Sequence, residues 1–182
     1  MAEVIFRKAR RTDVPEIVAL LADDPLGAGR EAVRNEAVGN EAVGDKAVGD
    51  KAVGNGAVGD GAVGNGVDAA YWRAFEAIDA DPSNALVVAD RDGEVVGTMQ
   101  LTFIPGLSRR GAERAQIEGV RVRADQRGTG LGRRMIEWAI ERARERDCRL
   151  VQLTTDKSRT DAHRFYASLG FQASHEGMKL NL

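Results

Sequence analysis

Two spacings of apolar residues divide most of the chain into short predicted strands and helices. Alternation of apolar and polar residues predicts strands at Val4–Ala9, Leu86–Asp90, Glu94–Phe103, Arg114–Arg123, Cys148–Thr154 and Gln172–Leu180. Apolar stripes at helical spacing predict helices at Val14–Ala22, Asp68–Ala80, Leu131–Arg146 and Asp161–Leu169. The order is βαα-βββ-αβ-αβ, which predicts an α/β (α+β) fold with a central mixed β-sheet flanked by helices.

Polar residues between these segments predict how they are joined. Thr12 or Asp13 suits the N-cap of the first helix, because a short side-chain oxygen can accept a first-turn N–H. Asp92-Gly93 is typical of a β-hairpin turn, since both residues tolerate a positive φ. The stretch Ile104–Ala112 contains Pro105 and Gly106 and is predicted to be a loop.

Residues 31–66 follow neither spacing. They consist of near-identical pentads such as Glu-Ala-Val-Gly-Asn, and a period of five would spread the apolar pairs around a helix. A pentapeptide solenoid is the structured alternative, but it usually carries Asn or Asp just before a central Leu or Phe. We therefore expect residues 1–182 to form a single domain, with 31–66 as a disordered low-complexity insertion between the first two helices.

The junction at Val120–Gly132 carries the clearest sign of chemistry. A predicted strand runs into Gly128, Gly130 and Gly132, and a long amphipathic helix follows at once. The first N–H groups of a helix lack partners and lie at the positive end of its dipole, so such a turn binds phosphate. A P-loop is excluded because Arg133 replaces its lysine, and the run G-x-G-x-G is not the dinucleotide fingerprint G-x-G-x-x-G.

Composition narrows the class of protein further. The net charge of −2 gives no general attraction to nucleic acid or acidic membranes, and no apolar run is long enough to span a bilayer. A single cysteine and two histidines distant in sequence make a metal centre an unfavoured interpretation. We therefore expect no metal. The start of the chain has no signal-peptide pattern, so we also expect a soluble cytoplasmic protein.

Two motifs resemble those of the GNAT superfamily of N-acetyltransferases. Arg127, Gly130 and Gly132 occupy the fixed positions of its pyrophosphate loop, Gln/Arg-x-x-Gly-x-Gly/Ala, and Ala162–Phe171 is similar to its Ala-x-x-Phe-Tyr-x-x-x-Gly-Phe helix. The stretch Arg159–Tyr166, with Ser174-His175, resembles the aminoalkylphosphonate acetyltransferase branch. Arg159 stands where many members carry a cofactor-binding asparagine. The branch's metal is not implied here, because no matching ligand cluster is visible.

The resemblance implies acetyl-CoA as co-substrate and a site along the central strand and the glycine turn. The residues implied to bind it are Val120, Arg121, Val122, Arg127, Gly128, Thr129, Gly130, Leu131, Gly132 and Arg133. The pantetheine arm would bond to the backbone of Val120 and Val122 like an added strand. Gly119 suits a bulge that would open this edge, although a glycine can also be an ordinary strand irregularity.

The resemblance also implies catalytic roles for two residues. Tyr166 matches the general acid that protonates the departing thiolate, and Glu118 matches a carboxylate that accepts the amine's proton, directly or through water. Packing alone for Tyr166 and a structural role for Glu118 are the alternatives. Strict alternation would put Glu118 on the same face as Val120 and Val122, unless a bulge at Gly119 intervenes. Cys148 is interpreted as a buried apolar residue, which argues against an acetyl-cysteine intermediate.

The function implied is transfer of acetyl from acetyl-CoA to the primary amine of a small molecule, by direct attack. Arg109, Arg110 and Arg159 are candidates for holding an anionic group of that acceptor. The alternatives are a protein lysine or N-terminal acetyltransferase, and a non-catalytic acyl-CoA sensor. No nucleic-acid or membrane partner is expected, and a homodimer is compatible with the resemblance.

Overall fold

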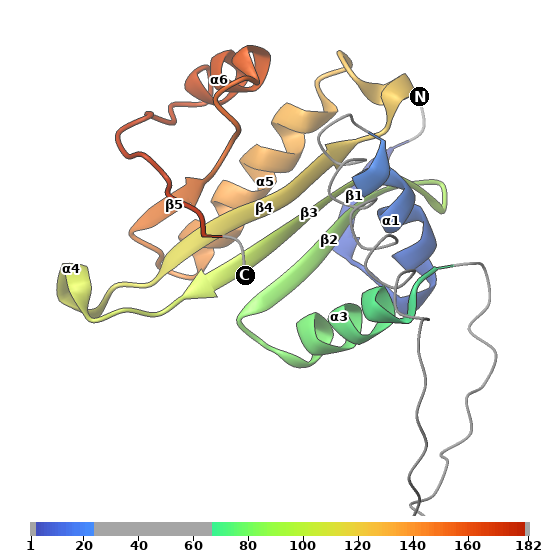
Figure 1. Cartoon of the computed structure of the whole chain (residues 1–182), viewed down its shortest axis with the longest axis horizontal. Helices are drawn as coiled ribbons and strands as arrows, with labels where there is room; N and C mark the ends of the chain where they lie inside the picture. The colour runs from blue at the N-terminus through green and yellow to red at the C-terminus, as the bar shows by residue number, and fades with distance from the viewer. Residues whose placement is uncertain (1–2, 24–66, 181–182) are drawn as a thin grey trace, which may run out of the picture.

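A computed structural model describes residues 3–23 and 67–180, and the predicted insertion at 31–66 lies outside them (Figure 1). One five-stranded sheet is described, in the order β1-β2-β3-β4-β5. Its strands are β1 (Val4–Lys8), β2 (Asn84–Arg91), β3 (Glu94–Ile104), β4 (Arg114–Val122) and β5 (Leu150–Leu153). The first four pair antiparallel and β5 runs parallel to β4, so the sheet is mixed as predicted.

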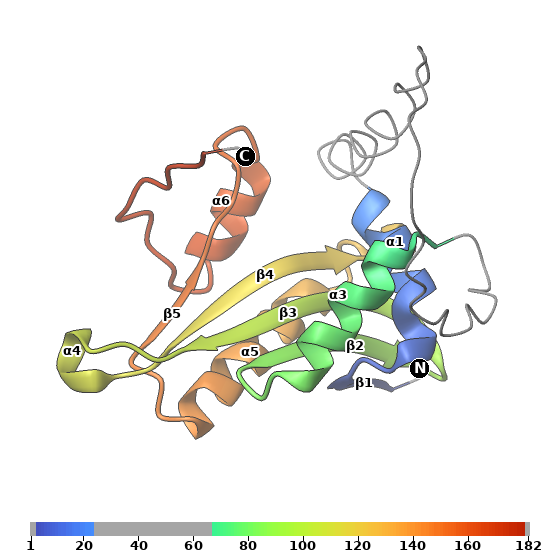
Figure 2. The same ribbon diagram turned by 60° about the horizontal axis from the view of Figure 1, so that its bottom comes forward.

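The helices are η1 (Arg11–Asp13), α1 (Val14–Ala22), α3 (Ala69–Ala80), α4 (Ser108–Gly111), η2 (Ala124–Gln126), α5 (Leu131–Glu145) and α6 (Thr160–Ala167). Helix α5 covers one face of the sheet and α1 and α3 cover the other, whereas α4 lies beyond the end of the strands (Figure 2). Val87 packs in the core beneath α5, whereas the next residue, Val88, packs beneath α1 and α3. Successive residues of a strand therefore contribute side chains to two separate hydrophobic cores, one on each face of the sheet.

The β2–β3 hairpin and the start of α1 follow from local polar residues. Asp92 and Gly93 have φ of 53° and 90°, and the Asp90 carboxylate accepts the Gly93 N–H at 2.7 Å. The hairpin prediction is confirmed. Asp13 occupies the N-cap position of α1, but its carboxylate accepts from the Arg10 N–H (2.7 Å) and the Arg7 guanidinium (2.6 Å) instead of the first turn.

Two sequence predictions are wrong among the described residues. The closing strand expected at Gln172–Leu180 is absent, and residues 171–180 form no regular element. A strand requires a paired edge, and the large apolar side chains of this segment, Met178 and Leu180, are 97% and 85% exposed. The predicted loop Ile104–Ala112 instead contains the short turn α4, in which Arg109 and Arg110 have left-handed φ of 54° and 63°.

Candidate active site

A β-bulge at Gly119 divides β4. Arg121 lies opposite Thr98 and Glu118 lies opposite Gln100, so Gly119 and Val120 together face one residue of β3. Gly119 has a φ of 59°, which a residue without Cβ adopts most readily. The predicted bulge is therefore present.

The bulge reverses which face the later residues of β4 occupy. Ala115 and Ile117 are buried beneath α5, and beyond the bulge Val120 and Val122 pack against the same core. Their residue numbers change from odd to even across Gly119. The side chain of Glu118 consequently departs from the face of Val120 and Val122, and it is exposed. Uniform alternation, the alternative considered from the sequence, does not hold.

The bulge also marks the point where β4 loses its second neighbour. Pairing with β5 ends at Ile117–Leu153, whereas pairing with β3 continues to Val122–Gly97. Figure 2 shows β5 diverging from β4 toward α6. The Arg123 N–H donates to the Val96 carbonyl at 3.0 Å on the β3 side. Since successive N–H groups point to opposite edges, the Val122 N–H faces the edge that β5 has left.

The open edge leads directly into the glycine turn. Gly128 and Gly130 have φ of 78° and 86°, and Gly130 is the N-cap of α5 without a side-chain cap. Apart from the adjacent residues of the chain, no heavy atom of the described residues lies within 4 Å of where a Cβ would stand on either glycine. The first N–H groups of α5, from Leu131, Gly132 and Arg133, have no partner within the helix. The geometry fits a pyrophosphate group.

Arg127 acts on the backbone of the site. Its Nε donates to the Val122 carbonyl at 3.1 Å, and its Nη2 donates to the carbonyl and carboxylate of Asp23 at 3.0 and 2.8 Å. Arg121 similarly donates to the carbonyl of Val120 at 2.9 Å. Thr129 closes the turn by donating its hydroxyl to the Gln126 carbonyl at 2.8 Å. Arg121, Arg127 and Thr129, which were predicted to bind the co-substrate, therefore hydrogen-bond to the backbone of the strand end and the turn in this structure.

Helix α6 meets the first turn of α5. An added Cβ on Gly132 would lie 3.7 Å from Phe165 and 3.7 Å from Val122, so these residues converge. The Arg133 guanidinium donates to the Ser168 hydroxyl at 2.7 Å. Tyr166 packs edge-on against Phe165 and Phe171, with ring centroids 5.1 and 5.9 Å away. The Phe-Tyr motif and the glycine turn, 30 residues apart in sequence, therefore share one region of the molecule.

The environment of Tyr166 keeps its hydroxyl protonated. Burial raises the pKa of Tyr166 above its ordinary value, and the charges of Arg159 and Arg121 offset this only in part. A protonated phenol can donate a proton to a thiolate. Arg159, a candidate for the acceptor site, is thus near Tyr166. Arg109 and Arg110 are not grouped with it, because they line a pocket with Arg146 and Arg149. Their element, α4, lies at the other end of β4 from the start of α5 (Figure 1).

Cys148 lies outside this region, just before β5. Its thiol approaches the Glu113 carboxylate at 3.7 Å, and burial together with that negative charge raises the pKa of the thiol. A protonated thiol is a poor nucleophile, which argues against an acetyl-cysteine intermediate, but Cys148 is half-buried and touches a carboxylate instead of being a buried apolar residue as predicted. Two contacts of the site escaped the sequence reasoning. Asp23 is 104 residues from Arg127, and Ser168 occupies an unspecified position of the Phe-Tyr motif.

Neither a metal centre nor a membrane span is found within residues 3–23 and 67–180. No group of three or more His, Cys, Asp or Glu side chains there could hold a metal ion. None of the helices in this part of the chain is long and apolar enough to cross a membrane.

Comparison with known proteins defines the class of protein. Residues 62–171, more than half of the chain, match the model of the Acetyltransferase (GNAT) family. The match, on a mixed sheet with an open-edged central strand, defines an acyltransferase, specifically an N-acetyltransferase. The chain belongs to the GNAT family.

Two relatives named as N-acetyltransferases agree with this assignment, and a solved structure agrees with the fold. The chain is 35% identical to an aminoalkylphosphonate N-acetyltransferase of Salmonella typhimurium over 106 residues, which are 58% of this chain and 68% of the relative. It is 34% identical to a glucosamine 6-phosphate N-acetyltransferase of Trypanosoma brucei brucei over 90 residues, 50% of this chain and 59% of the relative. A solved structure named a transcriptional regulator, from Bacillus halodurans C-125, matches with a TM-score of 0.78 and 41% identity, covering 99% of this chain and 100% of that one.

Proposed function

We propose that this enzyme transfers the acetyl group of acetyl-CoA to the primary amine of a small molecule that also carries an anionic group. The observation that carries the proposal is the single-sided pairing of β4 beyond Ile117, which leaves a backbone edge that runs into the turn before α5. A pantetheine arm is amide-rich and can pair with such an edge as a strand does. The pyrophosphate would then reach the N–H groups of Leu131, Gly132 and Arg133.

The reaction needs one proton acceptor, one proton donor and donors for an oxyanion. The neutral amine attacks the thioester carbon, and the N–C bond forms as the C=O electron pair moves onto oxygen. Backbone N–H groups near Val120 are proposed to stabilise that oxyanion. When the intermediate collapses, the C–S bond breaks and the thiolate takes the proton of Tyr166. Before the attack, Glu118, the exposed carboxylate beside the bulge, takes a proton from the substrate's ammonium through water. The second proton of that nitrogen leaves the intermediate through water and restores the Tyr166 hydroxyl.

An anionic acceptor is favoured by charge and by the relatives. Arg159 and Arg121 act electrostatically on Tyr166, so positive charge surrounds the proposed acid. Two relatives are named for amines that bear a phosphonate or a phosphate. A phosphonate near Arg159 would hold the amine in place, because guanidinium groups bind such anions with two hydrogen bonds.

The test is a panel of amines incubated with acetyl-CoA and followed by release of free thiol and by product mass. The panel contains aminoalkylphosphonates, hexosamine phosphates, the same amines without the anion, polyamines and lysine peptides. The expected result is acetylated product with the anionic small amines. Acetylation of peptides alone would favour a protein acetyltransferase. Acetyl-CoA binding without amine-dependent thiol release by any member would favour a sensor, and either result would overturn the proposal.

A further inference from the structure

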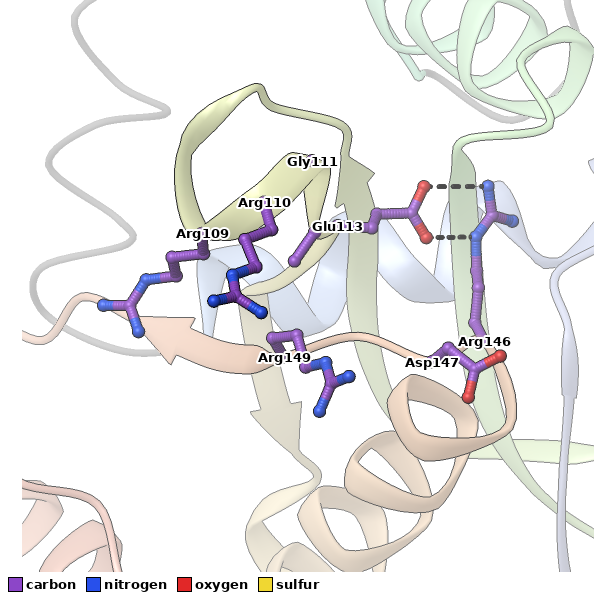
Figure 3. A pocket seen from close by; sticks show the side chains of 8 residues that line it. Arg109, Arg110, Gly111, Glu113, Arg146, Asp147 and Arg149 are labelled. Atoms are coloured by element: carbon purple, nitrogen blue, oxygen red, sulfur yellow. Dashed lines mark hydrogen bonds and ion pairs between the residues drawn. The ribbon is translucent and has the colours of Figure 1, made fainter.

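A second cluster of positive charge lies at the other end of β4 from the glycine turn. Arg109 and Arg110 of α4, Arg146 at the end of α5 and Arg149 before β5 line one pocket of about 790 Å³ (Figure 3). The pocket has two negative side chains, Glu113 and Asp147. Nine residues of β4 separate it from the turn, about 30 Å at 3.3 Å per residue. It is therefore a separate site from the candidate active site.

Three of these arginines have no carboxylate partner within residues 3–23 and 67–180. Glu113 is held by Arg146 through two bonds of 2.6 and 3.2 Å, and no ion pair of that part of the chain involves Arg109, Arg110 or Arg149. Figure 3 shows these three on one side of the pocket and the Glu113–Arg146 pair on the other. Many arginines elsewhere do form ion pairs: Arg123 with Asp125, Arg127 with Asp23 and Arg142 with Glu145.

The backbone that carries two of these arginines is strained. Arg109 and Arg110 have φ of 54° and 63°, and Asp147 on the facing loop has a φ of 57°. Positive φ is disfavoured for long side chains such as arginine, because the Cβ crowds the backbone carbonyl. Glycine would suit these positions better. Strain of this kind is retained where the side chain is needed, and here it places two guanidinium groups at one pocket.

We propose that this pocket binds a phosphate-bearing small molecule with more than one negative charge. Unpaired guanidinium groups repel one another, and a multivalent anion between them would relieve that repulsion. Their planar forks match phosphate oxygens with paired hydrogen bonds. The volume is within the range of small-molecule sites. This inference does not depend on the proposed acetyl transfer, since it involves none of the same residues.

The probe is pyrophosphate, added to the full-length chain and followed by backbone amide NMR. Residue-resolved shifts are needed because the glycine turn is a second candidate for the same anion. The expected result is saturable shifts at residues 107–113 and 146–149. Shifts confined to residues 128–133, or non-saturating shifts spread over the surface, would overturn the proposal.

Matched variants separate this site from general charge. Arg110→Gln and Arg149→Gln should each weaken pyrophosphate binding at the pocket by about tenfold, since charge-assisted bonds are the strong ones. Arg73→Gln removes the same charge from an exposed position of α3 and should leave the affinity unchanged. Equal weakening by all three variants would mean non-specific attraction, and would contradict a built site.

A stability measurement tests the strain independently. Arg110→Gly and Arg110→Ala both remove the guanidinium, but only glycine fits a φ of 63° without strain. Arg110→Gly should therefore have the higher Tm of the two, with equally weak pyrophosphate binding. A lower Tm for Arg110→Gly would show that the turn is not strained, and retained binding in both variants would remove Arg110 from the site.

Discussion

The two halves of β4 are continuous in sequence but have different surroundings in the fold. Arg114–Ile117 pair with β3 on one side and β5 on the other, whereas residues 118–122 pair with β3 alone. The first half lies in the interior of the sheet, and its residues Ala115 and Ile117 are buried. The second half has a free backbone edge and continues into the glycine turn.

Gly119 makes this difference by inserting one extra residue. A bulge bends its strand and increases the local twist, so a partner that was in register on one side can no longer follow. The same insertion moves Glu118 away from the face of Val120 and Val122. One glycine therefore accompanies the free backbone edge and separates the proposed base from the backbone proposed to hold the donor.

The largest expected effect is at the turn that ends the open half. Gly130→Val should abolish acetyl-CoA binding, because a side chain at a φ of 86° both strains the turn and occupies the open space before α5. Gly93→Val is the matched control, since Gly93 has a φ of 90° and also has no protein atom within 4 Å of a Cβ. Calorimetry should show lost binding only for Gly130→Val, with similar loss of stability in both. Equal affinities in the two folded variants would refute the site.

The second largest effect is expected at Tyr166, which lies on α6 near the half of β4 that pairs with β3 alone. Tyr166→Phe should lower kcat by roughly 10²–10⁴ without changing acetyl-CoA affinity, because it removes a proton donor and leaves the ring. Burial raises the pKa of Tyr166, so the wild-type rate should lose this contribution only above the ordinary range near pH 10, as the hydroxyl ionises. Steady-state kinetics across pH measure both. An unchanged kcat would assign Tyr166 to packing.

A smaller effect is expected at Glu118, which lies at the boundary between the two halves of β4. Glu118→Gln should move the pH–rate profile toward higher pH, since without the carboxylate a larger fraction of the amine must already be neutral. The expected loss at neutral pH is smaller than for Tyr166, about tenfold, because water can still carry the proton. Glu113→Gln, just before β4, is the control and should leave the profile unshifted. Coincident profiles of wild type and Glu118→Gln would leave Glu118 a structural residue.

The smallest effect is expected in the doubly paired half. The Gln152 amide donates to the Gln116 side chain at 2.6 Å across β4 and β5. Gln116→Ala should lower the free energy of unfolding by about 0.5–1.5 kcal/mol and leave acetyl-CoA affinity unchanged. Denaturant titration and calorimetry give the two quantities. A weakened affinity in a stable Gln116→Ala protein would show that the two halves do not act separately.

Much of this arrangement could be predicted from local sequence. The Asp92-Gly93 turn has a strong preference for positive φ, and α5 follows from regularly spaced Leu131, Met135 and Ala139. Gly119 signalled the bulge because glycine inside a strand is otherwise unfavourable. These features depend on the residue itself or on neighbours within a few positions.

Features that depend on distant partners could not be predicted. Nothing near Arg127 indicates that its guanidinium binds Asp23, since the contact is created by packing α1 beside the end of β4. The segment Gln172–Leu180 has a strand-like pattern but pairs with no edge within the described residues. The left-handed turn at Arg109 and Arg110 runs against their preferences, so no propensity argument would find it.

The bridge from Arg127 to Asp23 has a consequence for the binding of acetyl-CoA. One guanidinium holds both the Val122 carbonyl, on the proposed donor edge, and Asp23 at the end of α1. A donor that shifts this guanidinium also changes its contact with Asp23, and linkage requires each interaction to affect the other by the same factor. Asp23→Asn should therefore change the affinity for acetyl-CoA, and an unchanged affinity in a folded Asp23→Asn protein would exclude this coupling.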